Sequence, residues 1–157
     1  MLNRDAIARR IPHQGRMCLL DSVLEWNHDF ICCQSLSHQA PDHPLRAHDR
    51  LGATCGVEYA AQAMAVHGAL VAEEAGTPGS PPRAGYLASM RSVVLHVERL
   101  DTVLAPLLVR AERISGDANT VLYSFTVHAD AHLLLSGRAA VVLNAPLISL
   151  DSQQTIS

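Results

Sequence analysis

The feature that most constrains the fold is a single long helix, predicted over residues 56–74. This segment is rich in alanine, contains no proline and places apolar side chains at a spacing of 3.6 residues. Its apolar residues surround the helix axis on nearly every side, so the helix must be largely buried. Other elements therefore have to cover most of its surface.

The rest of the chain predicts strands. The segments 18–26 and 30–36 flank Asn27-His28-Asp29 and predict an opening hairpin. Alternating apolar and polar residues predict five strands after the helix, over 84–90, 92–99, 106–115, 119–129 and 132–144. This order predicts an α+β fold in which an antiparallel sheet wraps around the helix.

We expect one domain over residues 1–157, with a flexible tail over about 148–157, because neither a second core nor a repeat is visible. A sheet wrapped around one helix keeps free edges. Pairing two chains edge to edge would cover them, and we therefore expect a dimer.

Composition argues against several classes of function. A net charge of −3 without a basic run, and only six aromatic residues, argue against nucleic-acid binding. No apolar run approaches the ~20 residues that cross a bilayer, and no secretory segment is visible at residues 1–10, so we expect a cytoplasmic protein that does not enter the membrane.

Cofactors and metals are also not expected. All twelve basic residues are arginine, which excludes lysine Schiff-base chemistry, and no glycine-rich dinucleotide motif is present. The four cysteines form no C-x-x-C pair. His38, His43 and His48 follow one another at five-residue intervals, a spacing that matches no regular face of a helix or strand, so we predict no metal site.

Two motifs carry a resemblance to bacterial 3-hydroxyacyl-ACP dehydratases, a family with the hot-dog fold. Residues 11–23, Ile-Pro-His-Gln-Gly-Arg-Met-Cys-Leu-Leu-Asp-Ser-Val, resemble the opening motif of that family, and Glu-Tyr-Ala-Ala-Gln at 58–62 resembles Glu-Ala-x-Ala-Gln of its central helix. The segment 56–68, and Ser37-His38 ahead of Pro44-Leu45-Arg46, are similar to a divergent subgroup associated with aryl polyene pigment clusters.

The sequence departs from the family at one important place. Ordinary members carry Gly-His-Phe-Pro before the helix, whereas this chain has Asp-His-Pro-Leu at 42–45. Two histidines are therefore candidates for the catalytic base. His38 follows the end of a predicted strand, which would hold it more rigidly than the middle of a loop would. His43 nearly coincides with the position of the catalytic histidine in the family.

Dehydration needs a base that removes a C2 proton and an acid that protonates the departing hydroxyl. The resemblance assigns the acid to Glu58, whose pKa burial on an apolar helix would raise. Backbone N–H groups of Gly56 and Val57 would bind the enolate oxygen, and Gln62, one helical turn after Glu58, would orient its carboxyl or touch the thioester.

The resemblance implies acyl thioester substrates carried on acyl carrier protein, with histidine and acid from different subunits. Carrier proteins are acidic, so four arginines near the expected site would dock them: Arg46, Arg50, Arg83 and Arg91. Two other functions remain open. A hot-dog thioesterase would use Glu58 to activate water, and a weakly active partner subunit would complete a heterodimer with another hot-dog chain.

Overall fold

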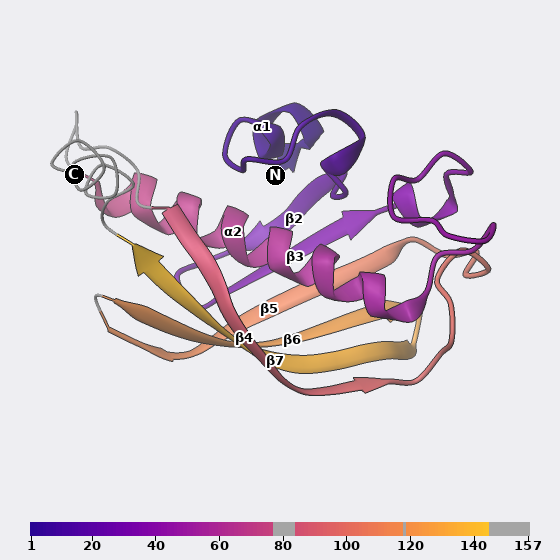
Figure 1. Ribbon diagram of the computed structural model, residues 1–157. Helices are drawn as coiled ribbons and strands as arrows, with labels where there is room; N and C mark the ends of the chain where they lie inside the picture. Colours follow the sequence, from indigo (N-terminus) through magenta and orange to yellow (C-terminus); the bar gives the residue numbers. More distant parts are fainter. Residues whose placement is uncertain (77–83, 118, 145–157) are drawn as a thin grey trace, which may run out of the picture.

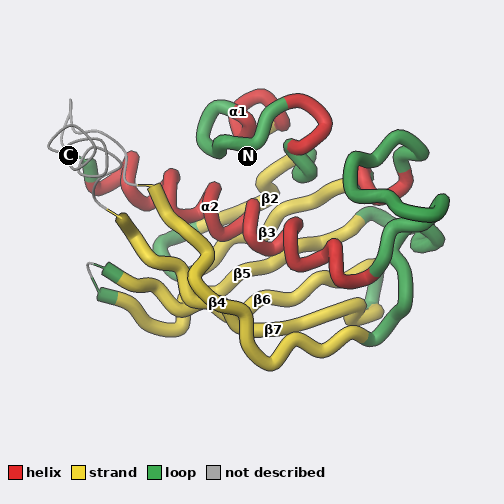
Figure 2. Tube along the Cα trace, in the orientation of Figure 1, coloured by secondary structure: helices red, strands yellow, loops and turns green. Residues whose placement is uncertain are grey.

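The computed structural model describes residues 1–76, 84–117 and 119–144, and the structural statements below concern these residues. The elements run in the following order (Figures 1 and 2): β1 (Leu2–Asn3), α1 (Arg4–Ala8), η1 (Gly15–Met17), β2 (Ser22–Trp26), β3 (Phe30–Ser35), η2 (Ser37–Gln39), η3 (Ala53–Cys55), α2 (Gly56–Ala75), β4 (Ala84–Leu95), β5 (Leu107–Gly116), β6 (Thr120–Ala129) and β7 (His132–Asn144). The elements named η are short 3-10 helices.

The strands form one sheet of seven, in the order β1-β2-β3-β5-β6-β7-β4, with antiparallel pairing throughout. The sheet curves around α2, which crosses one of its faces, while β4 bends across the end of the sheet (Figure 1). The expected sheet around one long helix is therefore observed. The helix ends one residue beyond the predicted position.

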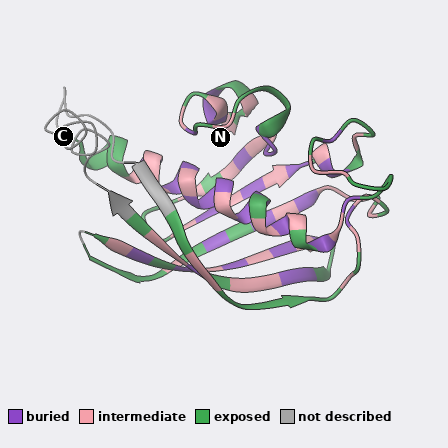
Figure 3. Ribbon diagram, in the orientation of Figure 1, coloured by how far each residue is buried: buried purple, intermediate pink, exposed green. Residues whose placement is uncertain are grey.

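The core lies between α2 and the concave face of the sheet, where buried positions alternate with partly exposed ones along β3 and β6 (Figure 3). α2 packs against β3, β5 and β6. At its first residue the helix comes so close to β7 that a Cβ on Gly56 would lie 2.5 Å from Leu135 Cδ2. Glycine is the residue that permits this approach.

A polar clamp fixes the chain just before α2. The Leu51 N–H donates to the Asp101 carboxylate over 3.0 Å, and the Leu100 N–H donates to the Leu51 carbonyl over 2.8 Å. Arg99 also donates to Asp101, and this hydrogen bond holds the pKa of the Asp101 carboxyl far below its usual range. The start of the helix is thus tied to the segment that follows β4.

Several predicted boundaries are wrong. The two strands predicted over 84–90 and 92–99 form the single strand β4, in which Ser92 adopts a φ of 54° and the register shifts between Arg91 and Val94. A serine at a left-handed φ interrupts the alternation, as bulges do. The predicted strand over 18–26 begins only at Ser22, and residues 2–3 add a short edge strand.

Two predictions concern residues outside the described part of the chain: the flexible tail over about 148–157 and the docking role of Arg83. Of the two α-helices that the structure describes, neither combines the length and the apolar character required to cross a membrane.

Candidate active site

His38 lies in η2 and is completely buried. Its Nε2 is 3.0 Å from the Val103 carbonyl oxygen. A carbonyl can only accept, so Nε2 carries the proton and Nδ1 keeps its lone pair. Nδ1 is one of two buried side-chain atoms without a hydrogen-bond partner in the described residues, and burial lowers the pKa of His38 below its ordinary value. The ring is therefore a neutral base with a free lone pair.

His43 is also buried, but both of its ring nitrogens are occupied. Nδ1 accepts the Leu45 N–H over 3.0 Å, so the proton of the neutral ring sits on Nε2. That N–H donates to the Tyr59 hydroxyl over 3.0 Å. Burial, and then the nearby charge of Arg46, lower the pKa of His43. In this arrangement His43 is neutral and has no lone pair to offer a substrate.

Tyr59 continues the hydrogen-bond chain toward His38. Because Tyr59 accepts from His43, its own proton points to Ser37 Oγ, 2.6 Å away. Ser37 Oγ in turn donates to the Leu19 carbonyl over 2.8 Å. Burial raises the pKa of Tyr59 to about 12, so the phenol stays protonated. No sequence motif indicated a role for Tyr59, although a hydroxyl on an otherwise apolar helix face is a signal that could have identified it.

Glu58 does not share the surroundings of the histidines. The next residue, Tyr59, points into the core, whereas Glu58 is exposed on the first turn of α2. The burial that we expected for this carboxyl is wrong for the single chain. Nor does any hydrogen bond join Glu58 to His38 or His43 among the described residues. One chain thus brings the two histidines together and leaves the acid facing outward.

Gln62 and Gly56 have partners other than those expected. Gln62 is fully buried, accepts the Leu19 N–H over 2.9 Å and donates to the Met17 carbonyl over 2.7 Å. Its amide thus fixes the segment before β2 rather than the Glu58 carboxyl. The Gly56 N–H is bonded within the turn formed by η3, which leaves Val57 as the candidate donor to an oxyanion.

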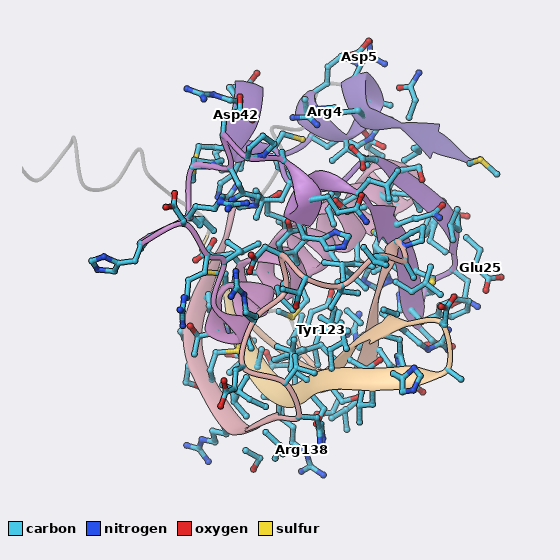
Figure 4. The ribbon with its side chains drawn as sticks, turned by 90° about the vertical axis from the view of Figure 1, so that its right-hand side faces the viewer. Arg4, Asp5, Glu25, Asp42, Tyr123 and Arg138 are labelled. Atoms are coloured by element: carbon cyan, nitrogen blue, oxygen red, sulfur yellow. The ribbon has the colours of Figure 1, made fainter. Side chains whose placement is uncertain are left out.

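Two other histidines, His67 and His48, lie in different surroundings. His67 is a satisfied core residue, with Nε2 2.8 Å from the Asn27 carbonyl oxygen and Nδ1 2.7 Å from the Tyr123 hydroxyl. Figure 4 shows Tyr123 inside the molecule. His48 is exposed on a two-residue turn. No group of three or more potential metal ligands is found in the parts of the chain that the structure covers.

Comparison with known proteins places the chain in a family. The model of the ApeP-like family, described as ApeP dehydratase, matches residues 5–155. The chain belongs to the ApeP-like dehydratase family. A search of the curated proteins finds no match.

Solved structures support the fold of this ApeP-like chain. The dehydratase heterocomplex ApeI:P from Xenorhabdus doucetiae is 19% identical, with a TM-score of 0.78 and coverage of 92% of this chain and 95% of that chain. A thioesterase family protein from Silicibacter pomeroyi is 13% identical, with a TM-score of 0.63 and coverage of 91% and 96%. A thioesterase from Staphylococcus aureus is 12% identical, with a TM-score of 0.57 and coverage of 79% and 93%. The predicted hot-dog fold is confirmed.

Proposed function

We propose that the chain is a subunit of a dehydratase that removes water from 3-hydroxyacyl groups carried as thioesters on acyl carrier protein. The observation that carries this proposal is the match to the ApeP-like dehydratase family over residues 5–155. The reaction requires one group that takes a proton from C2 and a second that gives a proton to the departing C3 hydroxyl.

His38 is the base in this proposal. Its Nδ1 lone pair has no partner, whereas both nitrogens of His43 are already bonded. The lowered pKa keeps His38 unprotonated at neutral pH, as a base requires. The hydrogen bond from Nε2 to Val103 stabilises the imidazolium that forms after proton transfer. His43 is assigned a structural role beside it.

Glu58 is the acid, and it acts on a substrate held between two chains. Its exposure on α2 leaves it available to a partner subunit that would bury it. The edge strand β4 offers a surface for that partner, since Leu87, Val94 and Leu95 are each more than two-fifths exposed. The similar structure from Xenorhabdus doucetiae is a heterocomplex, which favours a second hot-dog chain as partner.

The acyl carrier protein would dock on the arginine side chains near the site. Arg50 and Arg91 are exposed, whereas Arg46 is partly buried and donates to the Asp49 carbonyl over 2.8 Å. Arg83 lies outside the described residues. Arg50 and Arg91 are therefore the better candidates to meet an acidic carrier. We place this reaction in the cytoplasm.

A second function, that of a weakly active partner subunit, is favoured by one observation. Both candidate histidines are sealed from solvent in the single chain. A chain that supplied only Glu58 to a site whose base came from another subunit would need no accessible histidine. The two functions differ in what His38 contributes, and a single assay separates them.

The assay is mass spectrometry of water loss from a 3-hydroxyacyl-ACP, with the chain alone and together with a second hot-dog subunit. We expect Glu58→Gln to lower the rate ~100-fold or more, while Glu74→Gln, on an exposed carboxylate of the same helix, leaves it unchanged. Release of free acid instead would identify a thioesterase. Activity that needs the second subunit and survives His38→Ala would identify the partner-subunit role.

A further inference from the structure

The proposed function leaves the buried hydroxyl groups between η2 and α2 unused. Tyr59 Oη lies 2.6 Å from Ser37 Oγ, and Ser37 immediately precedes His38. We propose that Tyr59 is a positioning residue for His38, which acts by tying the short helix that carries this histidine to α2. The inference rests on the proposed function, because it concerns the geometry of the proposed base.

The direction of the hydrogen bonds follows from one backbone contact. The Leu45 N–H donates to His43 Nδ1, so His43 must donate from Nε2 to Tyr59. Among the described residues, the phenol proton then points to Ser37 Oγ, 2.6 Å away. His43 thus holds the Tyr59 hydroxyl in the orientation that engages Ser37, which gives His43 a part in the site without contact with substrate.

η2 depends on such contacts because it is only three residues long. Each of its side chains is hydrogen-bonded to another part of the fold. Ser37 bonds Tyr59, His38 bonds the Val103 carbonyl, and Gln39 donates to the Leu104 carbonyl over 2.6 Å. A single turn of 3-10 helix has little stability of its own. The direction of His38 Nδ1 is therefore set by these side-chain contacts on two sides.

Tyr59→Phe removes one side of this support and keeps the ring that fills the core. It leaves the His43 Nε2–H without its partner and frees Ser37 from α2. η2 then moves and water reaches His38. With burial reduced, the lowered pKa of His38 rises back toward its ordinary value near 6.5. Catalysis should therefore slow for two reasons. His38 is no longer held in position toward the substrate, and its pKa is no longer lowered.

The chain offers a matched control in Tyr123→Phe. That change also deletes one buried hydroxyl bonded to a histidine, at 2.7 Å from His67 Nδ1. The other partner of His67 is the Asn27 carbonyl, so this pair makes no hydrogen bond to η2. A second variant keeps the proposal testable if Tyr59→Phe fails to fold. Ser37→Ala removes the other end of the Tyr59 bond, and Tyr123→Phe serves as its control as well.

The experiment measures the pH dependence of water loss, with the partner subunit present, for Tyr59→Phe, Ser37→Ala and Tyr123→Phe. For Tyr59→Phe and Ser37→Ala we expect kcat to fall about 10- to 100-fold with little change in KM, and the acid limb to move to higher pH. The control Tyr123→Phe should keep the wild-type acid limb. An unchanged acid limb in folded Tyr59→Phe, or an equal shift in Tyr123→Phe, would overturn the proposal.

Failure of the proposed function is detected separately. If the wild-type complex releases no water, the dehydratase assignment is wrong, and NMR titration of His38 still tests the positioning role. A His38 pKa that rises in Tyr59→Phe but not in Tyr123→Phe supports the structural link. A His38 pKa that is equal in both variants contradicts it.

Discussion

Two buried tyrosine–histidine pairs lie along α2, one near its start and one near its middle, and the pairs behave differently. Near its start, Tyr59 meets His43 at 3.0 Å, and farther along, His67 meets Tyr123 at 2.7 Å. Burial raises the pKa of both tyrosines to about 12 and lowers the pKa of both histidines. By residue type and burial the pairs are the same.

They differ in which backbone group the second ring nitrogen meets. His67 Nε2 faces the Asn27 carbonyl and must donate to it, so Nδ1 accepts the Tyr123 proton and the chain of bonds ends there. His43 Nδ1 faces the Leu45 N–H, so Nε2 donates to Tyr59 and the phenol proton passes on to another group. The backbone group that meets the second ring nitrogen thus decides the direction of the bond. The tyrosine either donates its proton to the histidine of the pair or donates it to a third group.

The largest expected effect comes from removing the base beside the first pair. His38→Ala should lower kcat for water loss about 100- to 10,000-fold, because it removes the buried Nδ1 lone pair that takes the C2 proton in the proposed reaction. His43→Ala should cost about 10-fold, through loss of the Tyr59 contact alone. The measurement is steady-state water loss. Equal losses in the two variants would break the distinction between them.

The second pair should matter for stability and not for catalysis. Tyr123→Phe leaves a buried His67 nitrogen without a partner, which should lower the free energy of unfolding by about 1–3 kcal/mol. Urea unfolding measures this change. The rate of water loss per folded molecule should stay at the wild-type value, and a fall of more than a few-fold would contradict a purely structural role.

Acid should destabilise the fold through its buried histidines. The folded-state pKa of His67 is lowered, so its contribution to stability is complete above about pH 6.5 and is lost as the pH falls below that value, where the unfolded chain binds the proton first. Burial also lowers the folded-state pKa of His38 and His43, so their contributions to stability are lost at low pH in the same way. Each histidine adds at most about 1.4 kcal/mol per pH unit to the slope. His67→Gln should reduce the slope measured by urea unfolding between pH 8 and 5.5, and an unchanged slope would contradict this reading.

The smallest effect compares two glycines of α2. Gly68 has open space where a Cβ would be, so Gly68→Ala should raise the free energy of unfolding by up to about 1 kcal/mol through helix propensity. Gly56→Ala should lower it, because the new methyl group would meet Leu135. Thermal unfolding of both variants checks the signs, and stabilisation by both would show that the close packing at the helix start is tolerant.

The order of elements could be predicted from the sequence because it depends on local periodicity. The helix over 56–74 and the turn at Asn27-His28-Asp29 are encoded by their own residues. The break at Ser92 could not be predicted, because nothing in a serine requires a φ of 54°. That conformation arises from pairing of β4 with β7, which involves residues about forty positions away along the chain.

The site was predicted only in part for the same reason. Sequence patterns selected His38, His43 and Glu58, but the ranking of the histidines depends on the Leu45 N–H, the Val103 carbonyl and the Tyr59 hydroxyl, which no motif indicates. The surroundings of Glu58 were predicted incorrectly, because the apolar character of a helix as a whole does not tell which of its residues are exposed, and Glu58 is one of those that are. Gln62 was assigned by helical spacing, whereas its partners come from the segment before β2.

The most direct test of the account is to compare the acid limb of kcat/KM for water loss with the NMR titrations of His38 and His43 in the same protein. That limb reports the essential base of the free enzyme. We predict that its midpoint coincides with the titration of His38, below the ordinary histidine value of about 6.5. A midpoint that follows His43, or that matches neither histidine, would contradict it.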